Sequence, residues 1–227
     1  KEKSIILVSM KQNKKWGKTI DRANIEEWCI VQGFLTRELC EILEAYTDLA
    51  ISNKAMSYHT VNHYTGNGMC HDLYGDAFCE SIGVSKIPEL EKYTGGDISL
   101  TYGLLRQYQN KASLSWHRDR WECEYSASVQ VSKTAWPIHF ARDGAIGGQW
   151  KKNASVILQQ GDAVLYRGCE IYHSRDKLKH HRSRHLFLHY VEKGSAADNK
   201  DGRPNYGINN MKLKTRGLQV VDNKRRI

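Results

Sequence analysis

From residue 97 onward, the chain is a series of short strand-like runs separated by turn residues, and this pattern restricts the fold more than any other feature. Apolar and polar residues alternate from Tyr125 to Ser132 and again from Arg184 to Val191, as expected for strands with one buried face. The predicted strands cover 98–108, 125–132, 136–141, 154–158, 162–167 and 184–191. Strands that follow early helices in this way predict an α+β chain whose second half is an antiparallel sandwich or barrel.

Helices are predicted upstream of these strands. Thr36 is a suitable N-cap, and the apolar residues that follow it recur at three- and four-residue spacing, which predicts a helix over about 37–51. Two shorter helices are predicted at about 74–83 and 87–93, the second with Pro88 in its first turn. Residues 52–71 show no clear period and are interpreted as a loop.

Length and composition exclude several classes of protein. A chain of 227 residues with 40% hydrophobic residues favours one globular domain with appended arms. No apolar run approaches the roughly 18 residues of a membrane helix, so no membrane partner is expected. The six cysteines form no C-x-x-C pair, which leaves a four-cysteine zinc site unsupported and favours a reducing, cytoplasmic environment.

The net charge of +9 belongs to the two ends of the chain. Residues 1–18 hold six Lys and one Glu, and residues 212–227 hold six Lys or Arg and one Asp, so each end carries +5. The remaining residues, 19–211, therefore have a net charge of −1. The ends can be solvated arms or an electrostatic contact to nucleic acid or another polyanion, and the body of the domain has no such bias.

The residues that indicate chemistry are His117, Asp119 and His173. In a strand, residues i and i+2 point to the same face, so His117 and Asp119 can hold one ion together. His173 lies 54 residues after Asp119, and sheet pairing could bring it alongside. Two imidazoles and one carboxylate on one face of an octahedron are the ligands of non-haem Fe(II) oxygenases, which leave the other positions open.

The order of these residues resembles the 2-oxoglutarate and Fe(II) dependent oxygenase family, in particular its prolyl-hydroxylase-like branch. Tyr108 lies nine residues before His117, where that branch has an Arg-x-Tyr motif, and Gly161-Asp162 opens the strand before His173. The entry to the first helix, Gly33 to Thr36, is also similar, so the resemblance covers roughly residues 30–192. It implies a double-stranded β-helix, or jelly roll, with supporting N-terminal helices.

The resemblance also implies residue roles. His117, Asp119 and His173 would be the catalytic Fe(II) ligands, Arg184 would pair with the distal carboxylate of 2-oxoglutarate, and the Tyr108 hydroxyl would add a donor to the same cosubstrate. A guanidinium suits this role because its planar fork meets a carboxylate with two hydrogen bonds. Many such oxygenases carry Arg-x-Ser, a pattern from which this chain departs.

Arg182 competes with Arg184 for the cosubstrate role. Alternation favours Arg184, because it shares a face with three following residues of the last strand that would look into the barrel: Leu186, Leu188 and Tyr190.

The resulting prediction is an iron-dependent dioxygenase that uses O2 and 2-oxoglutarate to hydroxylate a peptidyl, prolyl-like, or small-molecule substrate. The predicted organisation is a basic arm and first strand over 1–29, the oxygenase domain over 30–192, and a polar, basic tail over 193–227. Two other interpretations remain open: a nucleic-acid-directed oxygenase that uses the basic ends, and a cupin-like jelly roll that binds metal without turnover. The oligomeric state is not indicated by the sequence.

Overall fold

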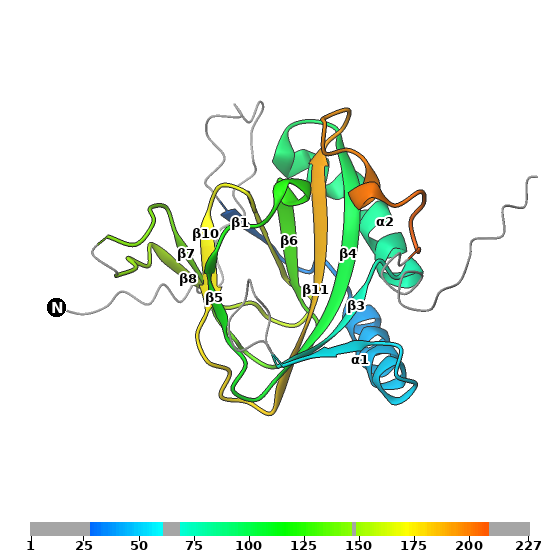
Figure 1. The fold of residues 1–227 in the computed structure, drawn as a ribbon. Helices are drawn as coiled ribbons and strands as arrows, with labels where there is room; N and C mark the ends of the chain where they lie inside the picture. The colour runs from blue at the N-terminus through cyan, green and yellow to red at the C-terminus, as the bar shows by residue number, and fades with distance from the viewer. Residues whose placement is uncertain (1–27, 61–68, 147–148, 209–227) are drawn as a thin grey trace, which may run out of the picture.

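Two antiparallel sheets face each other in the computed structural model, which describes residues 28–60, 69–146 and 149–208 (Figure 1). The larger sheet contains, in spatial order, β1 (Trp28–Val31), β9 (Ala163–Tyr166), β6 (Tyr125–Gln130), β11 (Arg182–Glu192), β4 (Ile98–Gln109), β3 (Cys70–Tyr74) and β2 (Ser57–His59). The smaller sheet contains β5 (Leu114–His117), β10 (Tyr172–Arg175), β7 (Ile138–Ala141) and β8 (Ala154–Val156). This is a double-stranded β-helix, and the predicted fold class is confirmed.

Two helices cover the outer face of the larger sheet, on the side away from the smaller sheet (Figure 1). Helix α1 (Arg37–Ser52) begins where the Thr36 hydroxyl accepts a hydrogen bond from the backbone N–H of Leu39, as the N-cap prediction requires. Helix α2 (Ala77–Thr94) is capped by the Asp76 carboxylate. Apolar side chains from both helices and from β4, β6 and β11 form the main hydrophobic core between helices and sheet.

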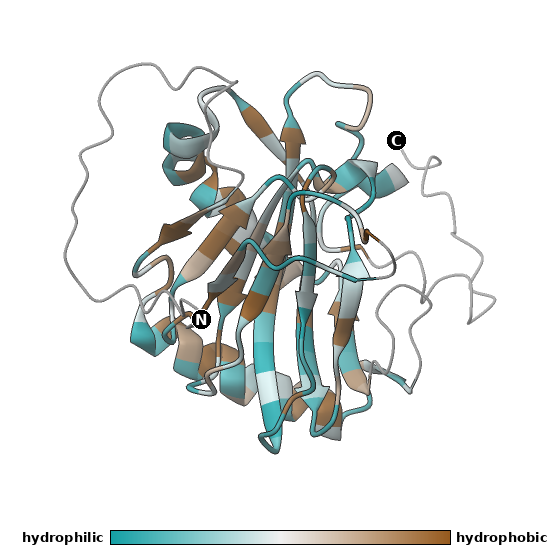
Figure 2. Cartoon of the chain, turned by 90° about the vertical axis from the view of Figure 1, so that its left-hand side faces the viewer, coloured by the Kyte–Doolittle hydropathy of each residue, from teal (hydrophilic) through white to brown (hydrophobic). Residues whose placement is uncertain are grey.

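The inner face of the larger sheet, by contrast, is rich in polar residues. Hydrophilic segments appear within the strands as well as in the loops (Figure 2). The buried polar side chains of β6 and β11 on this face are Ser126, Ser128, Gln130, Ser183, His185 and His189. Buried polar groups need partners, so a polar lining between two sheets favours a functional interior over a purely structural one.

The structure departs from the predicted elements in the first half of the chain. Residues 77–94 form one helix, and Pro88 lies inside it rather than in the first turn of a second helix. Proline has no backbone N–H, so Pro88 leaves the Val84 carbonyl without its usual helical hydrogen bond. The Val84 side chain is exposed, so this turn of the helix faces solvent and the helix can continue through Pro88. The predicted loop over 52–71 contains β2 and the start of β3.

Two short 3-10 turns complete the described elements: Trp121–Cys123 (η1), between β5 and β6, and Lys200–Gly202 (η2), after β11. The residues after η2 fold back on α2 and β4. Arg203 forms a buried ion pair with Glu80, and the Tyr206 hydroxyl donates to the Leu100 carbonyl at 2.8 Å. The basic ends, residues 1–18 and 212–227, lie outside the described residues. Among the described residues, no helix has the length and apolar character needed to cross a membrane.

Candidate metal centre

Strand pairing brings the two predicted histidine ligands side by side. His117, the last residue of β5, pairs directly with His173 of β10, and their ring centroids are 4.2 Å apart. Asp119 follows two residues later, just beyond the end of β5. Its Oδ1 lies 3.6 Å from Nε2 of His117 and 3.5 Å from Nε2 of His173. The structure thus brings the three predicted ligands together.

Backbone packing fixes the position of Asp119. Its N–H donates to the Gly168 carbonyl at 2.8 Å. A Cβ atom at Gly168 would lie 2.5 Å from Oδ2 of Asp119 and 2.5 Å from Oγ of Ser126, so no other residue fits there without movement. The close approach of this loop is therefore part of the site, although no spacing rule in the sequence marks it.

Both imidazoles are oriented by a hydrogen bond to the backbone carbonyl two residues earlier in the chain. Nδ1 of His117 lies 2.8 Å from the Ser115 carbonyl, and Nδ1 of His173 lies 3.2 Å from the Ile171 carbonyl. A carbonyl only accepts, so each Nδ1 carries the proton. Each Nε2 faces the space shared with Asp119, so the neutral ring with its proton on Nδ1 would present the Nε2 lone pair to a metal bound there.

The carboxylate of Asp119 is charged, and one of its oxygens is held by a hydrogen bond. Burial works to raise its pKa, but the imidazoles of His173 and His117 hold the pKa of this carboxyl well below its usual value. The Ser126 hydroxyl donates to Oδ2 at 2.8 Å and also lies 2.9 Å from Nδ1 of His189. Oδ1 remains available for a ligand.

These three donors fit a first-row divalent metal ion such as Fe(II). Adjacent ligands of an octahedral ion at about 2.1 Å are separated by about 3 Å, close to the separations seen here. Two neutral imidazoles and one carboxylate suit iron, and one face of such an ion would remain open.

A second group of potential ligands shares Asp119 and includes Cys123 and His189. Burial raises the pKa of the Cys123 thiol, whose sulfur lies 3.1 Å from the Tyr102 hydroxyl, so the thiol stays protonated. Burial also lowers the pKa of His189 to about 4, which keeps it neutral. Within this second group, His189 is connected to Asp119 through the Ser126 hydroxyl.

Arg184 does not lie near these ligands. It belongs to the face of β11 that packs against α1, where its guanidinium forms an ion pair with Asp48 and donates to Gln107 and to the Glu44 carbonyl. The predicted inward face, with Leu188 and Tyr190, is in fact the helix-covered face. Arg182 is exposed and contacts the same Asp48.

Tyr108 points into the interior between the two sheets. Most of the residues that surround it there were not predicted from the sequence to be part of the site. Its hydroxyl accepts from Nη1 of Arg106 at 3.3 Å, and its ring packs against Trp136 and His185. Arg175 completes this group, with its guanidinium 5.1 Å from the centroid of the Trp136 ring. We refer to Arg106, Tyr108, Trp136, Arg175 and His185 as the basic cluster.

Charge within the basic cluster is unevenly compensated. Arg106 forms a two-pronged ion pair with Asp72, with both contacts at 2.6 Å. Burial lowers the pKa of Arg175 to about 10, so it stays protonated at neutral pH. Burial, together with these two arginines, lowers the pKa of His185 well below its usual value and keeps the ring neutral. The only sequence signal for Arg175 is its i+2 spacing from His173.

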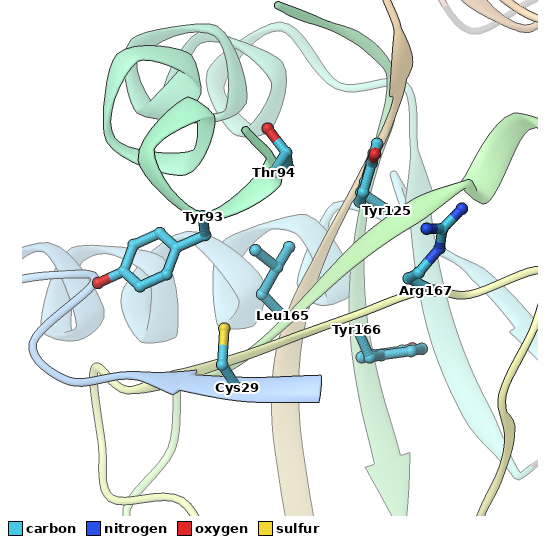
Figure 3. A pocket seen from close by; sticks show the side chains of 7 residues that line it. All are labelled: Cys29, Tyr93, Thr94, Tyr125, Leu165, Tyr166 and Arg167. Atoms are coloured by element: carbon cyan, nitrogen blue, oxygen red, sulfur yellow. The ribbon is translucent and has the colours of Figure 1, made fainter. Parts of the chain in front are cut away.

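Two other features involve none of the predicted ligands directly. Trp116 and Tyr172 alternate with the two histidine ligands, so they occupy the opposite face of the smaller sheet, where both join Trp150. A small cavity, shown in Figure 3, lies between β1, β9 and the end of α2. Its lining residues, none of them a predicted ligand, are Cys29, Tyr93, Thr94, Tyr125, Leu165, Tyr166 and Arg167.

Solved structures with the same fold were found, whereas no family model and no curated protein sequence matches the chain. A prolyl-4-hydroxylase from Pseudomonas putida aligns with a TM-score of 0.56 and 14% identity, covering 77% of this chain and 96% of that one. The non-haem alpha-ketoglutarate-dependent epimerase SnoN from nogalamycin biosynthesis aligns with a TM-score of 0.60 and 14% identity, over 83% and 90% of the chains.

HygX from Streptomyces hygroscopicus, solved with nickel and 2-oxoglutarate bound, aligns with a TM-score of 0.55 and 12% identity over 78% of this chain and 89% of that one. SnoN has also been solved with Fe3+ and alpha-ketoglutarate. At these identities the likeness concerns the fold. The chain therefore has the double-stranded β-helix fold of the 2-oxoglutarate and Fe(II) dependent oxygenases.

Proposed function

We propose that this protein is a 2-oxoglutarate- and Fe(II)-dependent dioxygenase that hydroxylates a C–H bond. The observation that carries the proposal is the convergence of His117, Asp119 and His173, each held by its own hydrogen bonds, at one point inside a double-stranded β-helix. In the overall reaction, O2 supplies one oxygen atom to the substrate, giving the alcohol. The other oxygen atom goes to 2-oxoglutarate, which is converted to succinate and CO2.

The residues of this chain have distinct roles in the proposed reaction. Fe(II), held by the two Nε2 atoms and by Oδ1 of Asp119, would supply the oxygen-activating chemistry. Ser126 holds the carboxylate in place through Oδ2, and the backbone carbonyls of Ser115 and Ile171 hold the imidazoles. The buried position of His173, which is 2% exposed, restricts access of water to this side of the metal.

The proposed substrate is a peptidyl side chain, prolyl or similar, or a small organic molecule. This class follows from the sequence resemblance to the prolyl-hydroxylase-like branch. It agrees with the range of the neighbouring folds, which include a prolyl-4-hydroxylase and an epimerase of nogalamycin biosynthesis. Nucleic acid is not favoured, because the positive charge that would attract it lies outside residues 19–211.

Succinate formation tests the proposal. When the substrate is absent, a reductant such as ascorbate can supply the two electrons that reduce the second oxygen atom to water, so we expect the full-length chain to release succinate from 2-oxoglutarate when Fe(II), O2 and ascorbate are present. Asp119→Ala should abolish this turnover and weaken Fe(II) binding, because one of three ligands is lost, while the circular dichroism spectrum stays unchanged. Asp143→Ala, which removes an exposed carboxylate, is the matched control and should retain both properties. Full turnover in Asp119→Ala would contradict the metal assignment.

A further inference from the structure

Arg175 is a buried cation that has no anionic partner among the described residues. It is 2% exposed, and its guanidinium donates to the Trp136 carbonyl and, at 3.2 Å, to Oγ of Ser128. Its Nε–H has no hydrogen-bond partner in the part of the chain that the structure describes. Removing a charge from water is costly unless an opposite charge compensates it, so this position calls for an anion that the described residues do not supply.

The other buried arginines show how unusual this is. Within the described ranges four arginines are less than 9% exposed, and three of them pair with a carboxylate: Arg106 with Asp72, Arg184 with Asp48, and Arg203 with Glu80. Arg175 forms no ion pair with a described residue. The fold therefore supplies an internal counterion to each structural arginine and leaves one guanidinium available.

The position of Arg175 relative to the metal centre follows from two strands. On β10 it comes two residues after His173, and on β6 its partner Ser128 comes two residues after Ser126, which contacts Asp119. Along both strands, Arg175 therefore lies two residues beyond the triad on the inward face, which corresponds to about 7 Å. The four carbon–carbon bonds of 2-oxoglutarate separate its two carboxylates by about 5 Å, a span of the same order.

The surroundings of Arg175 suit a carboxylate. The Tyr108 hydroxyl and Ser128 Oγ can donate to it, and the nearby Nδ1 of His185 is also buried with no hydrogen-bond partner from the described ranges. Arg106 is neutralised by Asp72, so one free positive charge remains in the basic cluster. A guanidinium can offer Nε–H and the second Nη2 hydrogen to the two oxygens of one carboxylate.

We propose that Arg175 binds the distal carboxylate of 2-oxoglutarate, the role that the sequence predicts for Arg184. This inference rests on the proposed function, because it assumes that the 2-oxo acid end of the cosubstrate lies at the metal. The inward-facing residue of the last strand is the neutral His185, next to Arg184. The anchoring charge comes instead from the strand that carries the second histidine ligand.

Binding of two 2-oxo acids separates a role in carboxylate recognition from a role in folding. 2-Oxopentanoate has the same chain length as 2-oxoglutarate but a methyl group in place of the distal carboxylate. Affinities are measured by anaerobic titration calorimetry on the Fe(II)-loaded full-length protein. We expect the wild-type protein to bind 2-oxoglutarate about 10- to 100-fold more tightly, as expected for charge-assisted hydrogen bonds to one carboxylate.

Arg175→Gln should lose this preference and bind both acids as weakly as wild type binds 2-oxopentanoate. Arg175→Lys should keep part of the preference, because the charge is retained without the fork. The affinity for Fe(II), measured separately, should not change in either variant. Arg184→Gln is the matched control, and it should keep the full preference even if its melting temperature falls.

The outcomes distinguish failure of this inference from failure of the proposed function. If Arg175→Gln keeps the preference, or if Arg184→Gln loses it, the anchor is not Arg175. If both Arg175 variants melt far below wild type, the residue is structural and the inference is overturned. If the wild-type protein binds neither Fe(II) nor 2-oxoglutarate, the proposed function fails, and this inference fails with it.

Discussion

At the scale of single residues, the metal centre depends on how one carboxylate is held. Asp119 lies beyond the end of β5, where no strand ladder fixes it, and its support comes from the Gly168 carbonyl and the Ser126 hydroxyl. A ligand held by such neighbours needs little reordering when a metal binds. Residues that orient ligands in this way commonly affect metal affinity almost as much as the ligands themselves.

Ser126→Ala should therefore weaken Fe(II) binding by about 10- to 100-fold, because Oδ2 of Asp119 would lose its donor. The measurement is a competition titration against a chelator of known affinity. Ser128→Ala is the control, since this serine faces the same interior one step along β6 but contacts Arg175 instead of Asp119. Equal loss of Fe(II) affinity in both variants would show that the polar lining acts generally and not through Asp119.

The residues of the triad could be predicted from sequence, but the orientation of Arg184 could not. A strand pattern gives two faces and does not say which of them is inside. The apolar face of β11, with Leu186 and Leu188, was expected to line the barrel because apolar faces are usually interior. In this fold the main apolar core lies between sheet and helices, and the inward faces of β6 and β11 are mostly polar. The prediction therefore assigned each side chain of the strand to the wrong side.

At the scale of elements, the contact between α2 and the larger sheet is unusually close at Gly83. A Cβ atom there would lie 2.7 Å from Cδ1 of Leu100 and 3.2 Å from Cδ2 of Leu188, and the Gly83 carbonyl accepts from the Tyr190 hydroxyl at 3.0 Å. The missing side chain lets the helix backbone approach β4 and β11. This contact holds α2 against the outer face of the larger sheet, whose inner face carries the polar residues.

Gly83→Ala tests this close packing, because two effects of the substitution oppose each other. Alanine favours a helix over glycine by about 1 kcal/mol, but overpacking a core costs about 1–3 kcal/mol. We expect the clash to outweigh the propensity, so the free energy of unfolding in a urea titration should fall. Ser85→Ala on the exposed side of α2 should be neutral or stabilising. A stabilised Gly83→Ala would mean that Leu100 and Leu188 move aside easily.

The predicted elements were accurate where the local pattern decides the structure. The helix after Thr36 and the strands β6 and β11 have clear periods and were found. The strands that carry the two histidines of the candidate metal centre, β5 and β10, have only four residues each, too few for a period to be recognised. Strands β2 and β3 were missed because β3 pairs with the distant strand β4, and β2 pairs in turn with β3, and a local pattern does not record such contacts.

At the scale of the whole molecule, the proposed metal would connect the two sheets. His117 and His173 belong to the smaller sheet, while Asp119 is tied through Ser126 to the larger sheet. An ion bound by all three ligands would therefore link both layers in the folded state. Because the unfolded chain does not hold these ligands together, metal binding should stabilise the fold as a unit.

Removal of the metal should consequently lower the melting temperature of the full-length protein. A ligand at 100 times its dissociation constant adds about 2.7 kcal/mol, which for a chain of this size corresponds to a shift of about 5–10 °C. Treatment with a chelator should produce this decrease in a thermal melt, and added divalent metals should reverse it. Among these metals Ni(II) should stabilise more than Fe(II), and Fe(II) more than Mn(II), whereas Mg(II), which prefers oxygen ligands, should have little effect.

Asp119→Ala supplies the control for this melt, because its melting temperature should respond weakly to the same metals. The order of the metals matters as much as the size of the shift. Two imidazoles select first-row transition ions, whereas non-specific binding to surface carboxylates would also respond to Mg(II). A shift of the same size with Mg(II), or in Asp119→Ala, would therefore show that the stabilising ion binds elsewhere. A metal-specific shift lost in the variant would locate the link between the two sheets at the triad.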